Sequence, residues 1–158
     1  MTNEALQTLI SNWIPDPIAI GLVFTEEGSQ FLNITVQPAQ LHQLMSQLKS
    51  NAETNFDYLF CLSGVDWGKE LGVVYHLESI THRHIIVVKV NTEDREDPVF
   101  DSVSNIWLTA EFHEREVFDF LGIKFNNHPN LKRLFLTDDW VGFPLRKDYV
   151  DEINMVVK

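Results

Sequence analysis

The sequence predicts an α+β fold: a mixed sheet of about five strands packed with helices and followed by an extended C-terminal tail. Three observations lead to this prediction. Apolar or alternating runs typical of strands recur five times before residue 92, and segments with apolar side chains at helical spacing lie before, between and after them. Beyond residue 125 an apolar-rich segment follows neither period and is broken by proline and glycine. We therefore predict an α+β body, 1–125, and a partner-binding tail, 126–158.

The first part of the chain predicts a helix, a hairpin and a second helix. Residues 4–13 have leucine, isoleucine and tryptophan at helical spacing, and Pro15 ends the run. Residues 18–24 and 31–36 are apolar or alternating and are separated by Glu-Glu-Gly-Ser, which predicts a β-hairpin. A proline stands at the first position of the helix predicted over 38–51, where its fixed backbone angle is favourable.

Three further strands and one charged helix complete the predicted body. Residues 57–65, 71–78 and 84–91 have the apolar alternation of strands. The loop 92–101 has one basic and five acidic side chains, so we expect a solvated connection. A helix over 103–121 follows, with a break near its Thr-Ala pair.

Gly122 directly follows this charged helix, at the position where a left-handed residue ends many helices. With 100° per residue, Glu114 projects into the apolar arc of the helix, whereas Arg115 and Asp119 project from the opposite side. We therefore expect Arg115 to be exposed between the carboxylates of Glu111 and Asp119, each pair contributing a few tenths of a kcal/mol. A carboxylate in the apolar arc must be either paired or solvated. We expect Glu114 to be charge-paired, so Glu114→Gln should destabilise the chain more than Asp119→Asn.

The tail contains more large apolar side chains than a free loop should expose. It must either wrap its own domain or lie on another protein, and we predict the latter. Two basic pairs flank its apolar part and are candidate partners for Glu114 or for acidic groups of a neighbour: Lys132, Arg133, Arg146 and Lys147. The apolar side chains are Leu131, Leu134, Phe135, Leu136, Trp140, Val141, Phe143, Leu145, Tyr149 and Val150.

Composition excludes several classes of function. The 158 residues include 12 basic and 23 acidic side chains, for a net charge of −11, which argues against a nucleic-acid partner. Residues 1–125 have 7 basic and 18 acidic side chains, and 126–158 have five of each. Cys61 is the single cysteine, so the chain cannot form an internal disulfide or a cysteine-ligated cluster. We expect no membrane-spanning segment, because the longest strongly apolar run is four residues.

The charged helix also permits two other interpretations. Glu111, His113 and Glu114 are the residue types of a free-standing acid–base enzyme. His113 with Glu114 or Glu116 could ligate a metal, but H-E-x-x-H is absent and adjacent helical residues point 100° apart. No nucleophile motif or phosphate-binding glycine loop accompanies them.

Three sequence blocks in order are more specific than any of these patterns. EREVFDFLGIKF (114–125), HPNLKR (128–133) and WVGFPLRKDY (140–149) closely resemble the signature of the C subunit of respiratory complex I, the proton-pumping NADH:quinone oxidoreductase. Asn127 stands where that family usually has glycine, and asparagine tolerates the left-handed conformation such a turn needs. The resemblance marks these residues as the family motif: Glu114, Arg115, Glu116, Asp119, Gly122, His128, Pro129, Lys132, Arg133, Trp140, Gly142, Pro144, Leu145, Arg146, Lys147, Asp148 and Tyr149.

The resemblance implies a structural subunit without cofactors, in the peripheral arm of the complex. Its partner would be the D subunit, which resembles a hydrogenase large subunit, with the iron–sulfur B and I subunits nearby. NAD, FMN and iron–sulfur clusters would be held by partner subunits, quinone would be the substrate of the complex, and electron transfer would be coupled to proton translocation. The chain would lie on the cytoplasmic side of the cell membrane, held through the complex. Related subunits occur in ferredoxin-dependent NDH-1-type complexes and energy-converting hydrogenases, which remain alternatives.

Overall fold

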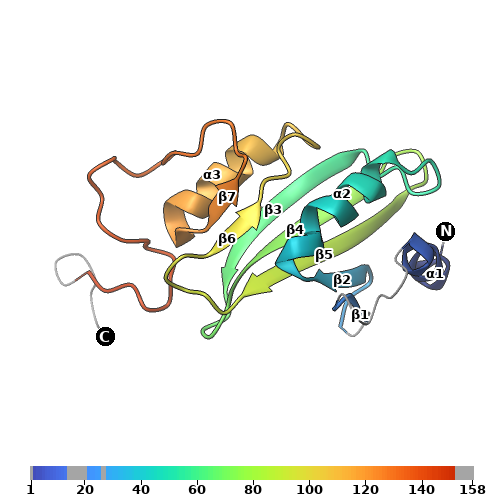
Figure 1. The fold of residues 1–158 in the computed structure, drawn as a ribbon, viewed down its shortest axis with the longest axis horizontal. Coiled ribbons are helices and arrows are strands. Elements are labelled where there is room, and N and C mark those ends of the chain that lie inside the picture. The colour runs from blue at the N-terminus through green and yellow to red at the C-terminus, as the bar shows by residue number, and fades with distance from the viewer. Residues whose placement is uncertain (1, 14–20, 26–27, 152–158) are drawn as a thin grey trace.

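A computed structural model describes residues 2–13, 21–25 and 28–151 of the chain, and it has the predicted α+β architecture (Figure 1). Five strands form one sheet in the order β1-β2-β5-β4-β3. The helices are α1 (Asn3–Trp13), the 3-10 helix η1 (Pro38–Gln40), α2 (Leu41–Ser50) and α3 (Ala110–Leu121). The strands are β1 (Val23–Thr25), β2 (Leu32–Val36), β3 (Tyr58–Asp66), β4 (Leu71–Ser79), β5 (His84–Thr92), β6 (Val99–Asp101) and β7 (Lys124–Asn126).

The sheet is mixed, as predicted. β2 pairs in parallel with β5, with Leu32 opposite Ile86, while the other neighbouring strands pair antiparallel. The predicted hairpin is present as the pair β1–β2, although its first strand begins only at Val23, and residues 18–20 lie outside the described residues. The parallel β2–β5 pair needs a crossover, and the connection contains α2 together with the β3–β4 hairpin.

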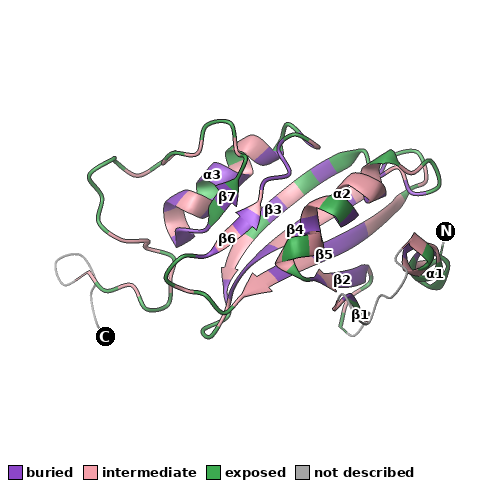
Figure 2. Ribbon diagram, viewed as in Figure 1, coloured by how far each residue is buried: buried purple, intermediate pink, exposed green. Residues whose placement is uncertain are grey.

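One face of the sheet forms the core. On β4 the side chains of Val73, Tyr75 and Leu77 are fully buried, and they alternate with half-buried residues of the opposite face. α2 and α3 lie over the same side of the sheet in Figure 1, and both contribute to one hydrophobic cluster with it. Figure 2 shows buried residues where strands and helices face each other and a largely exposed or half-buried tail.

The predicted helix over 103–121 is shorter than expected, because α3 begins only at Ala110. The preceding residues form turns that are held by side chains: Trp107 donates its indole N–H to the carbonyl of Phe56, and Ser104 donates its backbone N–H to the hydroxyl of Ser102. Such side-chain bonds compete with a regular helix. Gly122 ends α3 in the predicted left-handed conformation, with φ of 70°.

Strands β6 and β7 are a small parallel sheet that the sequence did not predict. Each has three residues, too few to show a period, and β6 lies at the end of the loop predicted to be solvated. β7 directly follows α3, so it begins the return of the chain along that helix. Asn127 then takes a φ of 62°, which confirms the left-handed turn expected there.

Candidate functional site: α3 and the tail packed on it

Glu114, on α3, has a fully buried side chain, as its place in the apolar arc predicts. Its carboxylate accepts hydrogen bonds from the Ser102 hydroxyl at 2.6 Å and from the Val103 backbone N–H at 2.7 Å. The prediction that a basic residue of the tail pairs with it, Lys132, Arg133, Arg146 or Lys147, is wrong. The turn before α3 provides neutral donors instead, and these are within reach because that segment is not helical.

The polar cluster around Glu114 also contains a histidine of the tail. His128 has a buried side chain whose Nε2 lies 3.8 Å from Glu114 Oε2. Its Nδ1 accepts the Asn130 backbone N–H at 3.0 Å, so Nε2 is the protonated nitrogen and donates to the Glu111 carbonyl at 2.9 Å. Burial raises the pKa of Glu114 to about 7, although the bonds from Ser102 and Val103 oppose that rise.

Asp119 fixes the tail to α3. It is fully buried, although the helical wheel places it on the exposed side. Its Oδ2 accepts three consecutive backbone N–H groups, those of residues 134–136, at 3.0, 2.6 and 3.0 Å, and Oδ1 accepts Arg133 Nη1 at 3.0 Å. Burial alone would raise the pKa of Asp119, but the bonds from Leu136, Phe135, Arg133 and Leu134 outweigh it and hold the pKa below its ordinary value.

Arg115 is also buried, at 8% exposure, which corrects the expected exposed bracket with Glu111 and Asp119. Its guanidinium donates to the backbone carbonyls of Lys132 and Arg133 at 3.2 and 3.1 Å. The face of α3 that was expected to be exposed is therefore covered by the tail. A helical wheel cannot detect this, because the covering residues lie 17 and 18 positions away in the sequence.

Arg133 organises the rest of the tail. Besides Asp119, its guanidinium donates to the carbonyls of Trp140 and Gly142, both at 3.1 Å, and so closes a loop of the tail. The same guanidinium lies 5.3 Å from the centre of the Phe143 ring. Phe143 in turn packs on Gly122, where an added Cβ would lie 2.4 Å from its ring.

A second ion-pair group holds the far end of the tail. Arg95 binds Asp66 through two hydrogen bonds of 2.8 and 2.9 Å and Asp148 through one of 3.0 Å. The guanidinium of Arg95 holds the pKa of Asp66 well below its ordinary value. Asp66 also accepts the Lys147 backbone N–H, and Arg146 donates to the carbonyls of Leu121 and Arg95. Sequence reasoning missed Asp66 and Arg95, because no motif links these separated positions.

The remaining motif residues have no buried charge. Gly142 has a φ of 85°, and an added Cβ would lie 2.8 Å from the Tyr149 ring. Pro129 is exposed in the turn after β7, Lys132 is exposed just beyond that turn, and Pro144 is half-buried. Glu116 is exposed on α3.

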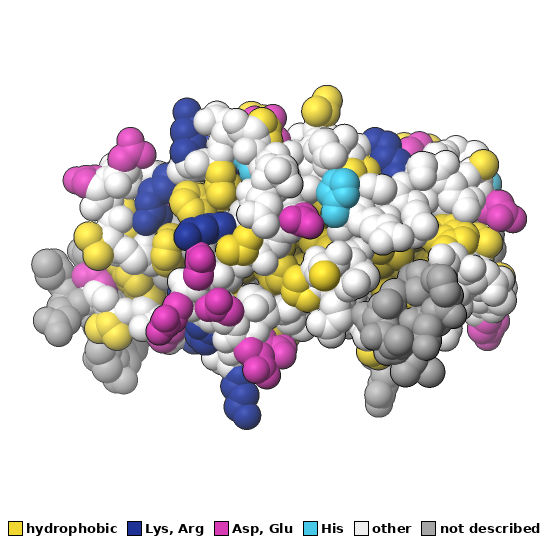
Figure 3. All heavy atoms as spheres, viewed as in Figure 1, with side chains coloured by type: hydrophobic (Ala, Val, Ile, Leu, Met, Phe, Trp, Pro, Cys, Tyr) yellow, Lys and Arg dark blue, Asp and Glu magenta, His cyan; other side chains and the backbone are white. Residues whose placement is uncertain are grey.

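The outer side of the tail exposes large apolar side chains. Val141 is 85% exposed, Phe135 64% and Leu145 62%, and Phe135 stacks on Phe120 of α3 with ring centres 5.6 Å apart. In Figure 3 apolar side chains lie among basic and acidic ones at this end of the molecule. We call the set the tail surface: Phe135, Trp140, Val141, Leu145 and Val150.

The acid–base and metal interpretations find no open site here. The Glu114 carboxylate is enclosed by Ser102 and Val103, so it does not face solvent together with Glu111 and His113. Within the described residues, no group of three or more histidine, cysteine, aspartate or glutamate side chains is placed to hold a metal ion. Over the same ranges, no helix is long and apolar enough to cross a membrane.

The family model and the curated relatives that match this chain indicate the same family. The model of the family described as "Respiratory-chain NADH dehydrogenase, 30 Kd subunit" matches residues 34–153. The C/D subunit of NADH-quinone oxidoreductase from Phocaeicola vulgatus is 52% identical over 122 residues, 77% of this chain and 23% of that protein. The C subunit of the same enzyme from Chloroherpeton thalassium is 48% identical, over 70% of this chain and 47% of that protein. The C subunit from Acidothermus cellulolyticus is 43% identical, over 84% of this chain and 70% of that protein.

A solved structure has the same fold. A chain of the membrane-bound sulfane sulfur reductase, described as an archaeal respiratory membrane complex, superposes with a TM-score of 0.77 at 25% identity, covering 95% of this chain and 86% of that one. This chain spans about a quarter of the C/D relatives and about half of the Chloroherpeton protein. The matched residues 34–153 include the last three residues of β2, strands β3 to β7 and the tail as far as residue 153, with both ion-pair groups. The chain therefore belongs to the family of 30 kDa subunits of the respiratory-chain NADH dehydrogenase.

Proposed function

We propose that this chain is the C subunit of a complex I-type NADH–quinone oxidoreductase. It acts as a structural part of the peripheral arm and supports electron transfer from NADH to quinone coupled to proton translocation. The observation that supports this most strongly is the construction of the tail. Buried charges of α3, Arg115 and Asp119, fix its backbone, while five of its large apolar side chains stay exposed. Such a preorganised surface suits binding, because little conformational freedom is lost when a partner docks.

The chemistry of the buried charges supports a structural role. Asp119 and Arg115 use their hydrogen-bonding capacity within the chain, and Asp66 does the same with Arg95 and Lys147. These groups determine shape, and the redox chemistry falls to partner subunits that hold NAD, FMN and iron–sulfur clusters. Quinone is then a substrate of the complex.

The D subunit is the proposed partner of the tail surface, with the iron–sulfur B and I subunits nearby. Relatives that carry the name C/D support this choice, because their name joins C and D in a single polypeptide. Fusion keeps two modules at high effective concentration, which benefits modules that bind each other. Attachment through the D subunit would hold the chain on the cytoplasmic side of the cell membrane.

The alternative is the equivalent subunit of a related assembly with another electron donor or acceptor, such as a ferredoxin-dependent complex or an energy-converting hydrogenase. The sulfane sulfur reductase chain favours this alternative, because that chain has the same fold in a respiratory complex with a different name. Its identity of 25% is well below the 40–52% of several NADH-quinone oxidoreductase relatives, so the NADH–quinone assignment is the better supported one.

A complementation experiment tests the proposal. Cells that lack this gene should lose NADH–quinone reductase activity in their membranes, and the wild-type chain should restore it. Val141→Glu changes a side chain that is 85% exposed, so it should leave the fold intact yet impair restoration. Glu96→Lys, in the acidic loop, is the matched control and should restore activity. Full restoration by Val141→Glu would argue against the tail surface, and unchanged activity without the gene would refute the assignment.

A further inference from the structure

Strand β3 is an open edge of the sheet. It ends the strand order, and among the described residues it pairs only with β4. The two ends of this edge are covered, because the Thr109 hydroxyl donates to the Leu59 carbonyl at 3.2 Å and the Lys147 N–H donates to Asp66 at 2.9 Å. Between these contacts, the outward backbone groups of 60–65 have no hydrogen-bond partner within the described ranges.

Between its covered ends, this edge has little protection against pairing with another chain. Exposed edge strands generally contain lysine or proline, or are very short. β3 has nine residues, YLFCLSGVD, and contains neither. Its one irregularity is a bulge at Phe60, between Leu59 and Cys61, so the stretch 61–65 is regular strand. An extended segment can therefore add to it through main-chain hydrogen bonds.

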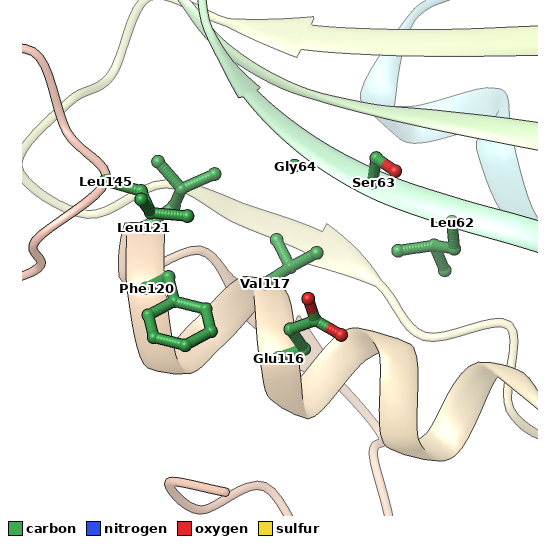
Figure 4. Close-up of a pocket in the computed structure, with 8 residues that line it drawn as sticks. All are labelled: Leu62, Ser63, Gly64, Glu116, Val117, Phe120, Leu121 and Leu145. Carbon is green, nitrogen blue, oxygen red and sulfur yellow. The ribbon is translucent and has the colours of Figure 1, made fainter. Parts of the chain in front are cut away.

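A pocket of about 170 Å³ lies between this edge and α3 (Figure 4). It is smaller than the roughly 300–1,000 Å³ of small-molecule sites, so its size suits one side chain. Gly64 sets the distance between the two elements, since a Cβ there would lie 2.4 Å from Leu121 Cδ1. Its aliphatic and aromatic side chains come from Leu62, Val117, Phe120, Leu121 and Leu145, while Ser63, Gly64 and Glu116 complete the lining, and its surface is about as polar as it is apolar.

Glu116 is the charged group of this pocket. It is exposed, and no hydrogen bond or ion pair is found for its carboxylate among the described residues. This sets it apart from Glu114 and Asp119 on the same helix, which are both satisfied within the chain. The net charge of −11 of the whole chain further favours a basic partner beside this carboxylate.

We propose that an extended segment of a partner subunit adds to the β3 edge over 60–65, inserts one aliphatic side chain into the pocket between β3 and α3, and places a lysine or arginine against Glu116. The proposal rests on the proposed function, since it names the chemistry of the partner segment. The open backbone suits an extended segment, the five apolar side chains of the lining suit an aliphatic side chain, and the unpartnered carboxylate suits a basic one. Leu145, which lines the pocket, also belongs to the tail surface, so the two form one interface.

Hydrogen exchange followed by mass spectrometry tests the backbone part. The full chain alone is compared with the same chain in the complex purified from native membranes. Outward amides of 60–65 should exchange at least about tenfold more slowly in the complex, because they gain acceptors. The opposite sheet edge, β1, is the internal control. Unchanged rates at 60–65, or equal slowing at both edges, would overturn the proposal.

Charge reversal tests the side-chain part. Glu116→Lys should lower recovery of the chain with its complex by about tenfold, whereas Glu93→Lys, an exposed acid on the loop after β5, should not. Equal recovery of the two variants would overturn the proposed basic partner. A wild-type chain that recovers no other protein of the complex would refute the proposed function itself. Slowed exchange at 60–65 in a dimer of the isolated chain would make a second copy the occupant and overturn the assignment to another subunit.

Discussion

Replacing Asp119 by asparagine should detach the tail from α3. One carboxylate accepts three backbone N–H groups and the Arg133 guanidinium, and it is fully buried. Asparagine retains one acceptor oxygen, and its NH₂ group must then face donors on the other side. Removing one partner of a buried ion pair costs about 3–5 kcal/mol. Because Arg133 is 14% exposed and water can partly replace its partner, we expect the lower end, about 3 kcal/mol.

Thermal and urea unfolding measure the cost of Asp119→Asn. For a domain of this size, about 3 kcal/mol lowers Tm by roughly 6–12 °C. Hydrogen exchange adds a local measurement, since the amides of residues 134–136 should lose their protection. Glu116→Gln is the control, because an exposed residue without a partner should change stability by less than about 0.5 kcal/mol. A loss below about 1 kcal/mol for Asp119→Asn, with unchanged exchange at 134–136, would refute the role of Asp119.

Three further changes test other parts of the structure. Burial raises the pKa of Glu114 from 4.5 to about 7, so this carboxyl ionises at lower pH in the unfolded chain than in the folded one. The free energy of unfolding should therefore fall by about 3 kcal/mol as pH rises from about 4.5 to 7. Urea titrations should show that Glu114→Gln removes this fall, and an equal fall in the variant would contradict the assignment to Glu114. Gly64→Ala places a methyl group against Leu121 and should cost about 1–3 kcal/mol in urea unfolding, with a neutral result indicating that α3 can move away. Arg95→Ala leaves the buried Asp66 without its guanidinium and should cost about 3 kcal/mol, so an unchanged Tm would count against this ion pair.

The sheet and the C-terminal end of α3 could be predicted because their signals are local. β4 alternates buried and half-buried residues, and Gly122 ends α3 in a left-handed conformation. The burial of Glu114 followed from its place in the apolar arc, since a wheel records how a side chain projects from its own helix.

The second layer over α3 could not be predicted in this way. Arg115 and Asp119 project away from the sheet, and only the return of the tail buries them. The contacts therefore reverse the expected ranking of Glu114→Gln and Asp119→Asn, because glutamine can still bond to Ser102 and Val103 whereas asparagine meets a row of donors. The turn before α3 was mistaken for helix because its side-chain hydrogen bonds have no periodic signature.

Affinity purification of the tagged full-length chain from its native membranes, with its partners identified by mass spectrometry, is the decisive measurement for the proposed place of this chain in the complex. We expect the D subunit to be recovered in equimolar amount with the chain, together with the B and I subunits, and recovery to fall with Val141→Glu. Recovery of the chain alone or only with copies of itself, under conditions that keep the complex intact, would contradict its assignment as a structural part of the peripheral arm.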